Sequence, residues 1–396
     1  MPRCALALVR LADPFVCGVQ IKTAVYDDHV KLGGKLVEFA GYWLPLQYKE
    51  GVKAECEQTR SAATLFDVSH MGQVRIHGRD CVKFIESCVV GDIAALQPGQ
   101  AALSLITNTK GGIIDDCVIT KEAGTVGVVI NGACKHKDLK HMGEMLHKSG
   151  MDAKIEHLEH LALFALQGPK AASALARITE GVDFEHMLFM TAGKGKVAGI
   201  DVGVTRCGYT GEDGFELSVS NDKASALMQA LLSETGGVVK PAGLGARDTL
   251  RVEAGLCLYG QDIDENTTPV EASLLWTIGK RRRAEGGFPG AKIILDQVKN
   301  KPPMKRVGFV VNGAPARSHT KLFASETASD DQAIGEILSG TCSPTLGKPV
   351  AMGYVEQKYG ANDTTVYAKV RNKMVPVVVS KMPFVPSNYY RGPGSK

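Results

Sequence analysis

A glycine-rich acidic turn between two apolar segments constrains this chain more than any other feature. The stretch reads Arg206-Cys-Gly-Tyr-Thr-Gly-Glu-Asp-Gly-Phe-Glu216, with a glycine at every third position from 208 to 214. Valines precede it, and Leu217 and Val219 follow it, so the pattern predicts a strand, a tight turn and a second strand. Repeated glycines suit unusual backbone dihedrals or a close approach to a bound molecule. This geometry would place Tyr209 and Glu216 beside one small site, although an ordinary hairpin with a solvated acidic tip fits the segment equally well.

The composition is that of an ordinary globular enzyme. The chain has 396 residues, of which 44% are hydrophobic and 22% charged, and its net charge is +4. This length is typical of about two or three domains with a substantial core. No basic, aromatic-rich stretch indicates nucleic-acid binding, and no apolar run approaches the roughly 20 residues that span a bilayer. We therefore expect neither nucleic acid nor a membrane as a partner.

The cysteine and histidine patterns predict no metal site. The ten cysteines include no Cys-x-x-Cys pair. His157 and His160 are three residues apart, but Glu159 does not stand where a His-Glu-x-x-His zinc site requires its glutamate. Phosphate-loop, dinucleotide-binding and nucleophile-elbow motifs are also missing from the sequence. We expect most of the cysteines to be buried thiols.

The first 22 residues differ from the rest of the chain. They carry Arg3, Arg10 and Lys22 but a single acid, Asp13, among small and apolar residues. Such an arginine-bearing, acid-poor start predicts a mitochondrial presequence over residues 1–22, although it lacks the usual serines. A disordered tail is the alternative.

Alternating strand and helix patterns predict an α+β protein with a different C-terminal part. Gly72–Gly78 has the period of a half-buried strand, and Ala224–Leu232 that of a helix. From Pro302 onward, short apolar runs separated by Gly and Pro indicate a mostly β module. The clearest domain boundary lies near residues 285–303.

Two further segments gather charge in unusual places. Gly111-Gly112-Ile113-Ile114-Asp115-Asp116 places two acids after a glycine turn and at the start of an apolar run. An acid that enters a buried strand has a raised pKa or meets a donor, so we expect one of the pair to be functional, with a solvated turn as the alternative. Arg247 and Arg251 stand one helical turn apart, as in a bound-ligand contact or in a common surface ladder of ion pairs.

Seven segments in a fixed order carry a resemblance. They are Phe39–Gly41, Phe66–Met71, Gly111–Asp116, Cys207–Glu216, Ala246–Gly260, Thr267–Glu271 and Lys381–Phe384. From about Tyr26 to Tyr390 the chain resembles the aminomethyltransferase (T-protein) family of the glycine cleavage system, and its closing tyrosines are most similar to the eukaryotic members. The resemblance implies a mitochondrial matrix enzyme with three domains in a cloverleaf around a central folate cavity, the C-terminal domain being a mostly β barrel.

The resemblance also implies the reaction. Family members transfer the methylene carbon from the aminomethyl-lipoyl arm of the H carrier protein to tetrahydrofolate, and release ammonia and 5,10-methylenetetrahydrofolate. Tetrahydrofolate is a co-substrate, and no metal, flavin or nicotinamide is required. The expected partners are the lipoyl-bearing H protein and the other glycine cleavage components. A non-catalytic folate-binding protein of the same fold, of the iron–sulfur assembly type, is the alternative, although its Lys-Gly-Cys-Tyr motif is absent.

Domains and site residues follow from the same likeness. The first domain would combine residues 23–70 with about 155–255, the second 71–154 with about 256–285, and the third would be 300–390. Asp116 takes the catalytic position, and the folate-contact positions fall on Glu216, Arg247 and Tyr389. The residues expected to line the site are Met71, Leu103, Asn131, Tyr209 and Trp276. The basic run 280–283 would dock an acidic carrier protein or be a solvated loop.

Overall fold

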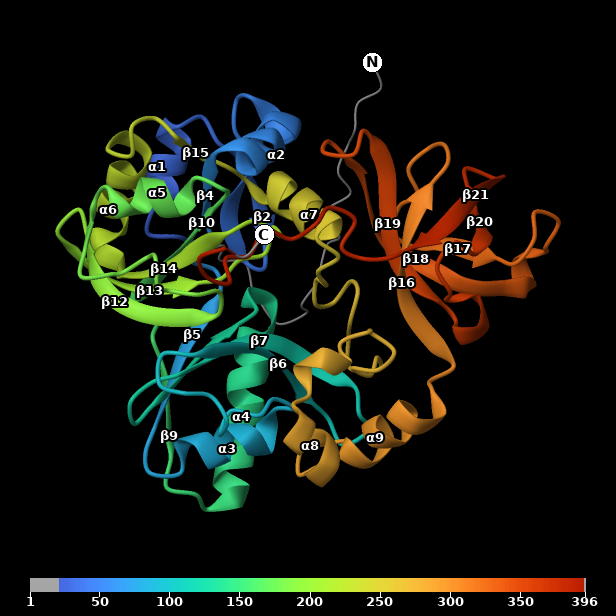
Figure 1. Cartoon of the computed structure of the whole chain (residues 1–396), viewed down its shortest axis with the longest axis horizontal. Helices are drawn as coiled ribbons and strands as arrows, with labels where there is room; N and C mark the ends of the chain where they lie inside the picture. Colours follow the sequence, from blue (N-terminus) through green and yellow to red (C-terminus); the bar gives the residue numbers. More distant parts are fainter. Residues whose placement is uncertain (1–20, 395–396) are drawn as a thin grey trace.

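A computed structural model of the chain describes residues 21–394, which form three lobes (Figure 1). The predicted presequence lies outside the described residues except for its last two positions. Ile21 and Lys22 form β1 (Ile21–Lys22), which pairs in parallel with Tyr42 and Trp43 of β3. Those two positions therefore already belong to the fold.

The first lobe is built on a seven-stranded sheet in the order β11-β12-β13-β14-β10-β4-β15. Its core packs Phe164 and Phe215 of the sheet against Leu227 and Leu231 of α6. The strands are β4 (Ala63–Asp67), β10 (Leu161–Gln167), β11 (Thr179–Glu180), β12 (Thr191–Val197), β13 (Ile200–Arg206), β14 (Gly214–Ser220) and β15 (Val239–Pro241). The helices are α1 (Tyr26–Lys31), α2 (Gly51–Ser61), α5 (Ala171–Ala176), α6 (Asn221–Ser233) and α7 (Leu244–Glu253). A small sheet of β1, β2 (Lys35–Phe39) and β3 (Tyr42–Gln47) lies in the same lobe.

The second lobe has a five-stranded antiparallel sheet in the order β6-β7-β8-β5-β9. One face is covered by α3 and α4, which bury Phe84, Ile85 and Met142 against it. The elements are β5 (Gly72–His77), β6 (Ala101–Thr107), β7 (Ile113–Lys121), β8 (Val126–Ile130), β9 (Lys154–His157), α3 (Cys81–Cys88) and α4 (Lys135–Ser149).

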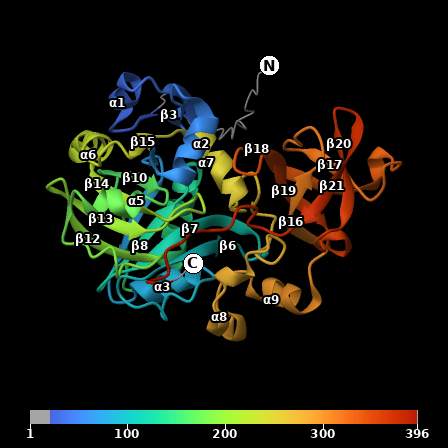
Figure 2. The same ribbon diagram turned by 45° about the horizontal axis from the view of Figure 1, so that its top comes forward.

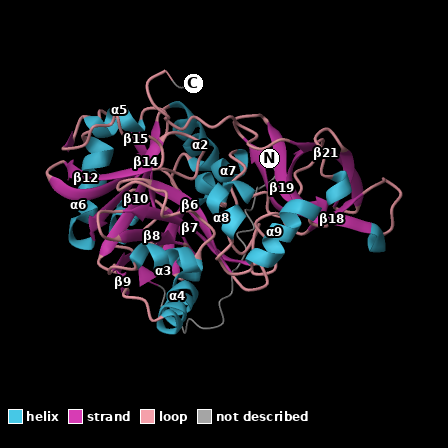
Figure 3. Ribbon diagram, turned by 60° about the horizontal axis from the view of Figure 1, so that its bottom comes forward, coloured by secondary structure: helices cyan, strands magenta, loops and turns pink. Residues whose placement is uncertain are grey.

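The predicted boundary near 285–303 is not a bare linker, because it contains a helix. α8 (Lys280–Glu285) and α9 (Ala291–Asn300) lie between the second lobe and the barrel (Figures 1 and 3). Ile294 of α9 packs with Leu105 and Ile113 of the second sheet. Ile294 is the buried residue of this helix, and Gly and Pro residues flank it, so the segment reads as a linker in the sequence.

The third lobe is a closed barrel of six strands in the order β16-β19-β18-β17-β20-β21. Its interior is filled by alternating apolar residues such as Phe309, Ile337 and Val379. The strands are β16 (Met304–Val311), β17 (Thr320–Phe323), β18 (Ala333–Ser343), β19 (Lys348–Glu356), β20 (Thr365–Val370) and β21 (Lys373–Ser380). After β21, the chain leaves the barrel and returns across the molecule to the first lobe (Figure 2), where Asn388 N–H donates to the Gly211 carbonyl oxygen.

The three lobes meet around α7. This helix packs against α2 and β3 of the first lobe and against β18 and β19 of the barrel. The sheets divide the chain close to residues 70, 158 and 303, and we propose the predicted domain division on that basis. The helix therefore connects the apolar interior of the first lobe to the barrel wall.

Candidate active site

The predicted hairpin surrounds a turn whose acids are paired with arginines rather than solvated, Glu212 being buried and Asp213 half-buried. Gly211 has a left-handed φ of 81°, and a side chain on Gly208 would collide with Gln167. Glu212 accepts a hydrogen bond from Arg60 at 2.9 Å, and Asp213 pairs with Arg206. The alternative of a solvated acidic tip is therefore wrong, and the close approach of the glycines is to the protein's own chain.

The two acids of the pair point to opposite faces of β7. Neighbouring residues in a strand alternate faces, so Asp115 faces the helices and Asp116 the other side. Asp115 is completely buried, whereas Asp116 is enclosed but keeps part of its surface accessible. The solvated-turn alternative is thus wrong for this segment too.

Asn131, just beyond β8, ties the two acids together. Its side-chain amide donates to Asp115 Oδ1 at 2.9 Å and to Asp116 Oδ1 at 3.0 Å. Its backbone N–H donates to Asp115 Oδ2 at 3.0 Å. One side chain therefore sets the orientation of both carboxyl groups.

Burial raises the pKa of the Asp116 carboxyl to about 7, and the negative charge of Asp115 adds to the rise. The Asn131 amide and the Arg247 guanidinium act in the opposite direction. The shift exists because a single amide donor replaces the water that a carboxylate would otherwise bind. A partly accessible group with such a pKa changes its charge near neutral pH and is typical of functional sites.

Glu216 on β14 and Tyr209 in the turn converge on Arg247 of α7. The Arg247 guanidinium lies over the Tyr209 ring, 4.6 Å from its centroid, and the charges of Glu216 and Asp116 act on it. Burial raises the pKa of the Glu216 carboxyl, and Arg247 opposes that rise. Among residues 21–394, no hydrogen bond or ion pair engages the Arg247 guanidinium, so its donors remain available. The structure thus brings Asp116, Tyr209, Glu216 and Arg247 within electrostatic reach of one another.

Comparison with known proteins bears on the family of this chain. Residues 25–282 match the family model of the GCVT N-terminal domain, and residues 305–386 match that of the glycine cleavage T-protein C-terminal barrel domain. Among similar proteins, "Aminomethyltransferase, mitochondrial" of Homo sapiens is 49% identical over 388 residues, covering 96% of this chain and 94% of the relative. The protein of that name from Dictyostelium discoideum is 48% identical over 378 residues, covering 93% of each chain.

A solved structure has the same fold. The crystal structure of glycine cleavage system aminomethyltransferase T from Bartonella henselae superposes with a TM-score of 0.87 at 36% identity, covering 94% of this chain and 100% of that one. This chain belongs to the glycine cleavage T-protein family. The predicted family, α+β fold with a C-terminal barrel, transferase class and mitochondrial location are confirmed, and no comparison favours the non-catalytic alternative.

Two of the predicted lining residues lie on the Asp116 side of the second sheet. Leu103 of β6 pairs with Val118 of β7, two residues from Asp116, and so shares its face. Met71, which precedes β5, packs with Val129 against the apolar cluster under α7. Both positions fit the T-protein site proposed below.

Tyr389 and Trp276 lie toward the edges of the candidate site. Tyr389 stacks on Phe189, with ring centroids 4.0 Å apart. Trp276 sits on the short 3-10 helix Leu275–Thr277, which contacts β6, and 63% of its surface is exposed. A tryptophan this exposed is available to a ligand or a partner protein.

Sequence reasoning missed two buried groups near the site. His70 is 3% exposed, its Nδ1 has no hydrogen-bond partner among the described residues, and Arg247 and Lys135 help burial to lower its pKa to about 3. Asp138 of α4 is fully buried behind Asp115. His70 lies in the Phe66–Met71 segment of the resemblance, but no local pattern marks Asp138, which stands in an ordinary polar helix.

Arg251 and two arginines of the basic run form internal contacts of the T-protein. Arg251 is 1% exposed and binds Asp262 at 2.6 Å and Asp248 at 2.7 Å, so the surface-ladder alternative is wrong for it. The run 280–283 is helical rather than a solvated loop. Arg281 binds Glu86 and Asp92, both at 2.7 Å, and Arg282 is buried against backbone carbonyls, which leaves Lys280 and Arg283 exposed.

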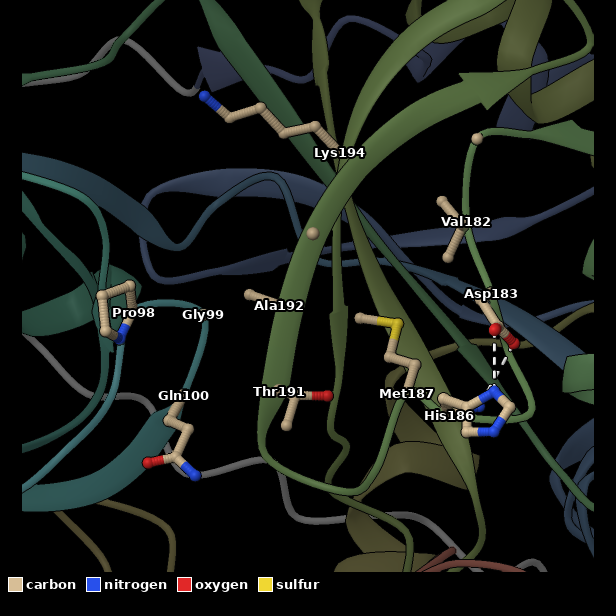
Figure 4. Close-up of a pocket in the computed structure, with 12 residues that line it drawn as sticks. Pro98, Gly99, Gln100, Val182, Asp183, His186, Met187, Thr191, Ala192 and Lys194 are labelled. Atoms are coloured by element: carbon tan, nitrogen blue, oxygen red, sulfur yellow. Dashed lines mark hydrogen bonds and ion pairs between the residues drawn. The ribbon is translucent and has the colours of Figure 1, made fainter.

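A separate pocket of about 380 Å³ lies where the two sheets meet. Figure 4 shows Pro98 and Gln100 on one side and Thr191, Ala192 and Lys194 of β12 on the other, with His186 bound to Asp183. No predicted site residue lines it. Within residues 21–394, no three acidic, histidine or cysteine side chains gather to hold a metal ion, and no helix is long and apolar enough to cross a membrane.

Proposed function

We propose that the site formed by Asp116, Glu216 and Arg247 binds tetrahydrofolate and transfers to it the methylene carbon carried by the lipoyl arm of the H protein. One observation carries this proposal: two enclosed carboxyl groups of raised pKa face an arginine whose donors are unused. Such a site keeps carboxylate acceptors and guanidinium donors to spare and is completed by a ligand that offers both N–H donors and acceptors.

A reduced pterin fits this donor set. Its exocyclic amine and neighbouring ring N–H lie side by side, so a carboxylate such as Glu216 can accept from both. Arg247 then donates to an acceptor of the pterin or of the folate tail. Tyr209 contributes a flat apolar face, which its hydroxyl fixes by donating to the Cys257 carbonyl oxygen. Trp276 and Tyr389 would border the same ligand.

Asp116 would act on the nitrogen atoms that accept the carbon. The aminomethyl thioether loses ammonia, its carbon bonds to two folate nitrogens, and the two protons that those nitrogens release go to the ammonia and to the lipoyl sulfur. A carboxylate beside these nitrogens positions them and stabilises cationic character on the carbon. Asn131 holds the Asp116 carboxyl in one orientation for that purpose.

The partners that follow are the lipoyl-bearing H protein and the other glycine cleavage components. The test is ammonia release from aminomethyl-loaded H protein, with and without tetrahydrofolate. Release that depends on tetrahydrofolate supports the proposal. A chain that binds tetrahydrofolate but releases no ammonia would instead be the non-catalytic folate-binding type.

Replacing Glu216 with glutamine should mainly weaken folate binding. Loss of a charged acceptor to two donors costs about 1.5–3 kcal/mol, or roughly 10–100-fold in Kd. Titration calorimetry with tetrahydrofolate measures the change, with Glu234→Gln, an exposed glutamate of the same lobe, as the matched control. Wild-type affinity in Glu216→Gln would exclude the bidentate contact.

The exposed part of the basic run should contribute to docking of an acidic carrier. We expect Lys280→Gln with Arg283→Gln to raise the KM for H protein by about three- to tenfold at low salt, with kcat unchanged. The same salt that screens the wild-type interaction should erase the difference. Lys240→Gln with Lys348→Gln, two other exposed lysines, is the control. A carrier KM insensitive to both salt and these substitutions would show that α8 serves only its internal ion pairs.

A further inference from the structure

A third carboxyl group lies behind the acid pair, on the helix side of the second sheet. Asp138 belongs to the first turn of α4, and none of its surface is exposed. Neither of its oxygens accepts a hydrogen bond from any group among residues 21–394. A buried carboxyl without partners costs several kcal/mol, so this group requires an explanation.

The surroundings of Asp138 do not neutralise it with a cation. The titratable groups that interact electrostatically with Asp138 belong to β7, α4, the segment before α4 and the segment after α7. They are Asp115, Asp116, Cys117, Cys134, Lys137 and Tyr259. Lys137 is the cation of this described set, and its ammonium already donates to the Ile114 carbonyl oxygen at 2.6 Å and to the Tyr259 hydroxyl at 2.8 Å.

Two carboxylates enclosed side by side cannot both carry a charge, so one proton must stay between Asp115 and Asp138. Asp115 already accepts two hydrogen bonds from Asn131, and these favour its charged form. Asp138 accepts none. The proton therefore belongs on Asp138, and burial together with the charge of Asp115 raises the pKa of Asp138 far above its usual range.

A protonated Asp138 also accounts for its unpartnered oxygens. A carboxylic acid has one O–H donor, which a carboxylate lacks, and Asp115 is the acceptor beside it. The O–H of Asp138 would then donate to Asp115, the amide of Asn131 donates to Asp115, and the same amide donates to Asp116. These bonds form an unbroken path from the helix to the accessible carboxyl.

We propose that Asp138 is a positioning residue of the T-protein: it keeps a proton at neutral pH, donates it in a hydrogen bond to Asp115, and so holds Asp115 ionised and aimed at Asn131, which orients Asp116. This inference rests on the proposed role of Asp116. The protonation of Asp138 has an electrostatic as well as a geometric effect, because the charge of Asp115 contributes to the raised pKa of Asp116.

Infrared spectroscopy tests the protonation directly. We expect the difference spectrum between the wild-type chain and Asp138→Asn, recorded above the pKa of Asp116, to contain the carbonyl stretch of a protonated carboxylic acid. The band should shift in D2O and on labelling the aspartate side chains with ¹³C. The exposed control Asp201→Asn should give no such band. A wild-type spectrum without the Asp138 band would overturn the proposal, and this result needs no activity measurement.

Kinetics separate positioning from a merely structural role. Asn at 138 can still donate to Asp115, so Asp138→Asn should keep kcat within about threefold and leave the pH profile in place. Leu has a similar size but no donor, so Asp138→Leu removes the hydrogen bond to Asp115 and with it the restraint on Asn131 and Asp116. We expect kcat to fall by about tenfold or more in Asp138→Leu, whereas the donor that remains in Asp138→Asn should retain it.

The outcomes remain distinct from those of the proposed function. A wild-type kcat in Asp138→Leu would overturn the positioning role. If Asp138→Leu does not fold, the infrared comparison with Asp138→Asn still decides where the proton resides. If Asp116→Asn retains full turnover, the role of Asp116 fails, whereas the infrared band still reports the protonation of Asp138.

Discussion

Asp116→Asn should lower turnover of the T-protein by about 10²–10⁴-fold while tetrahydrofolate binding is largely kept. Asn has the same shape as Asp and can keep a hydrogen bond to Asn131, so the geometry of the site survives. What it loses is the negative charge that stabilises cationic character in the transition state, and the capacity to take a proton. Ammonia release under saturating H protein and folate gives kcat, and calorimetry gives the folate affinity.

The pH dependence should change in the same variant. The pKa of Asp116 is raised to about 7, so the reactive carboxylate forms only as the pH rises through that value. For the wild-type chain, kcat/KM for folate should therefore climb through about pH 7 and level off above it, because kcat/KM reports the free enzyme. Asp116→Asn should lack this limb, and Asp201→Asn should keep it. Unchanged turnover in Asp116→Asn would remove this residue from the mechanism.

Glu253→Ala should lower the free energy of unfolding by about 3–5 kcal/mol, because it breaks a buried ion pair where the first lobe meets the barrel. Glu253, the last residue of α7, is fully buried and accepts from Arg60 Nη2 at 2.7 Å. It also accepts from the hydroxyls of Ser343 and Thr345 in the barrel lobe. Its removal leaves Arg60 with Glu212 as its remaining carboxylate, and leaves two barrel hydroxyls without their acceptor.

Urea unfolding followed by circular dichroism measures this loss, with separate probes for the sheets and the barrel because a three-lobed chain need not unfold in one step. The control is Glu57→Ala on α2. Glu57 pairs with Lys53 at 3.7 Å, but both side chains are more than half exposed, so the change should cost less than about 1 kcal/mol. Equal midpoints for the two variants would show that the junction does not depend on this ion pair.

Local pattern was sufficient for much of the fold. The strand on each side of the glycine turn, the helix over Ala224–Leu232 and the short strands after Pro302 all form where the apolar period predicts them. The C-terminal barrel followed from the family resemblance. The helix α9 escaped prediction because it is only ten residues long and lies between Gly and Pro residues that usually mark linkers.

The family, the enzyme class and the acids of the proposed site, Asp116 among them, could be inferred from the chain alone, since order and spacing of chemically distinctive residues are properties of the sequence. The difference in exposure between Asp115 and Asp116 could not be predicted, because a strand's alternation acquires an inside and an outside only when a helix covers one face. The tertiary structure also shows which charged side chains already have ion-pair partners. Arg251, Arg281 and Glu212 look as available as Arg247 in the sequence, yet each is paired through contacts with distant segments. Asp138 shows the same limit, since its proton is dictated by a neighbour 23 positions away in the chain and not by any residue beside it.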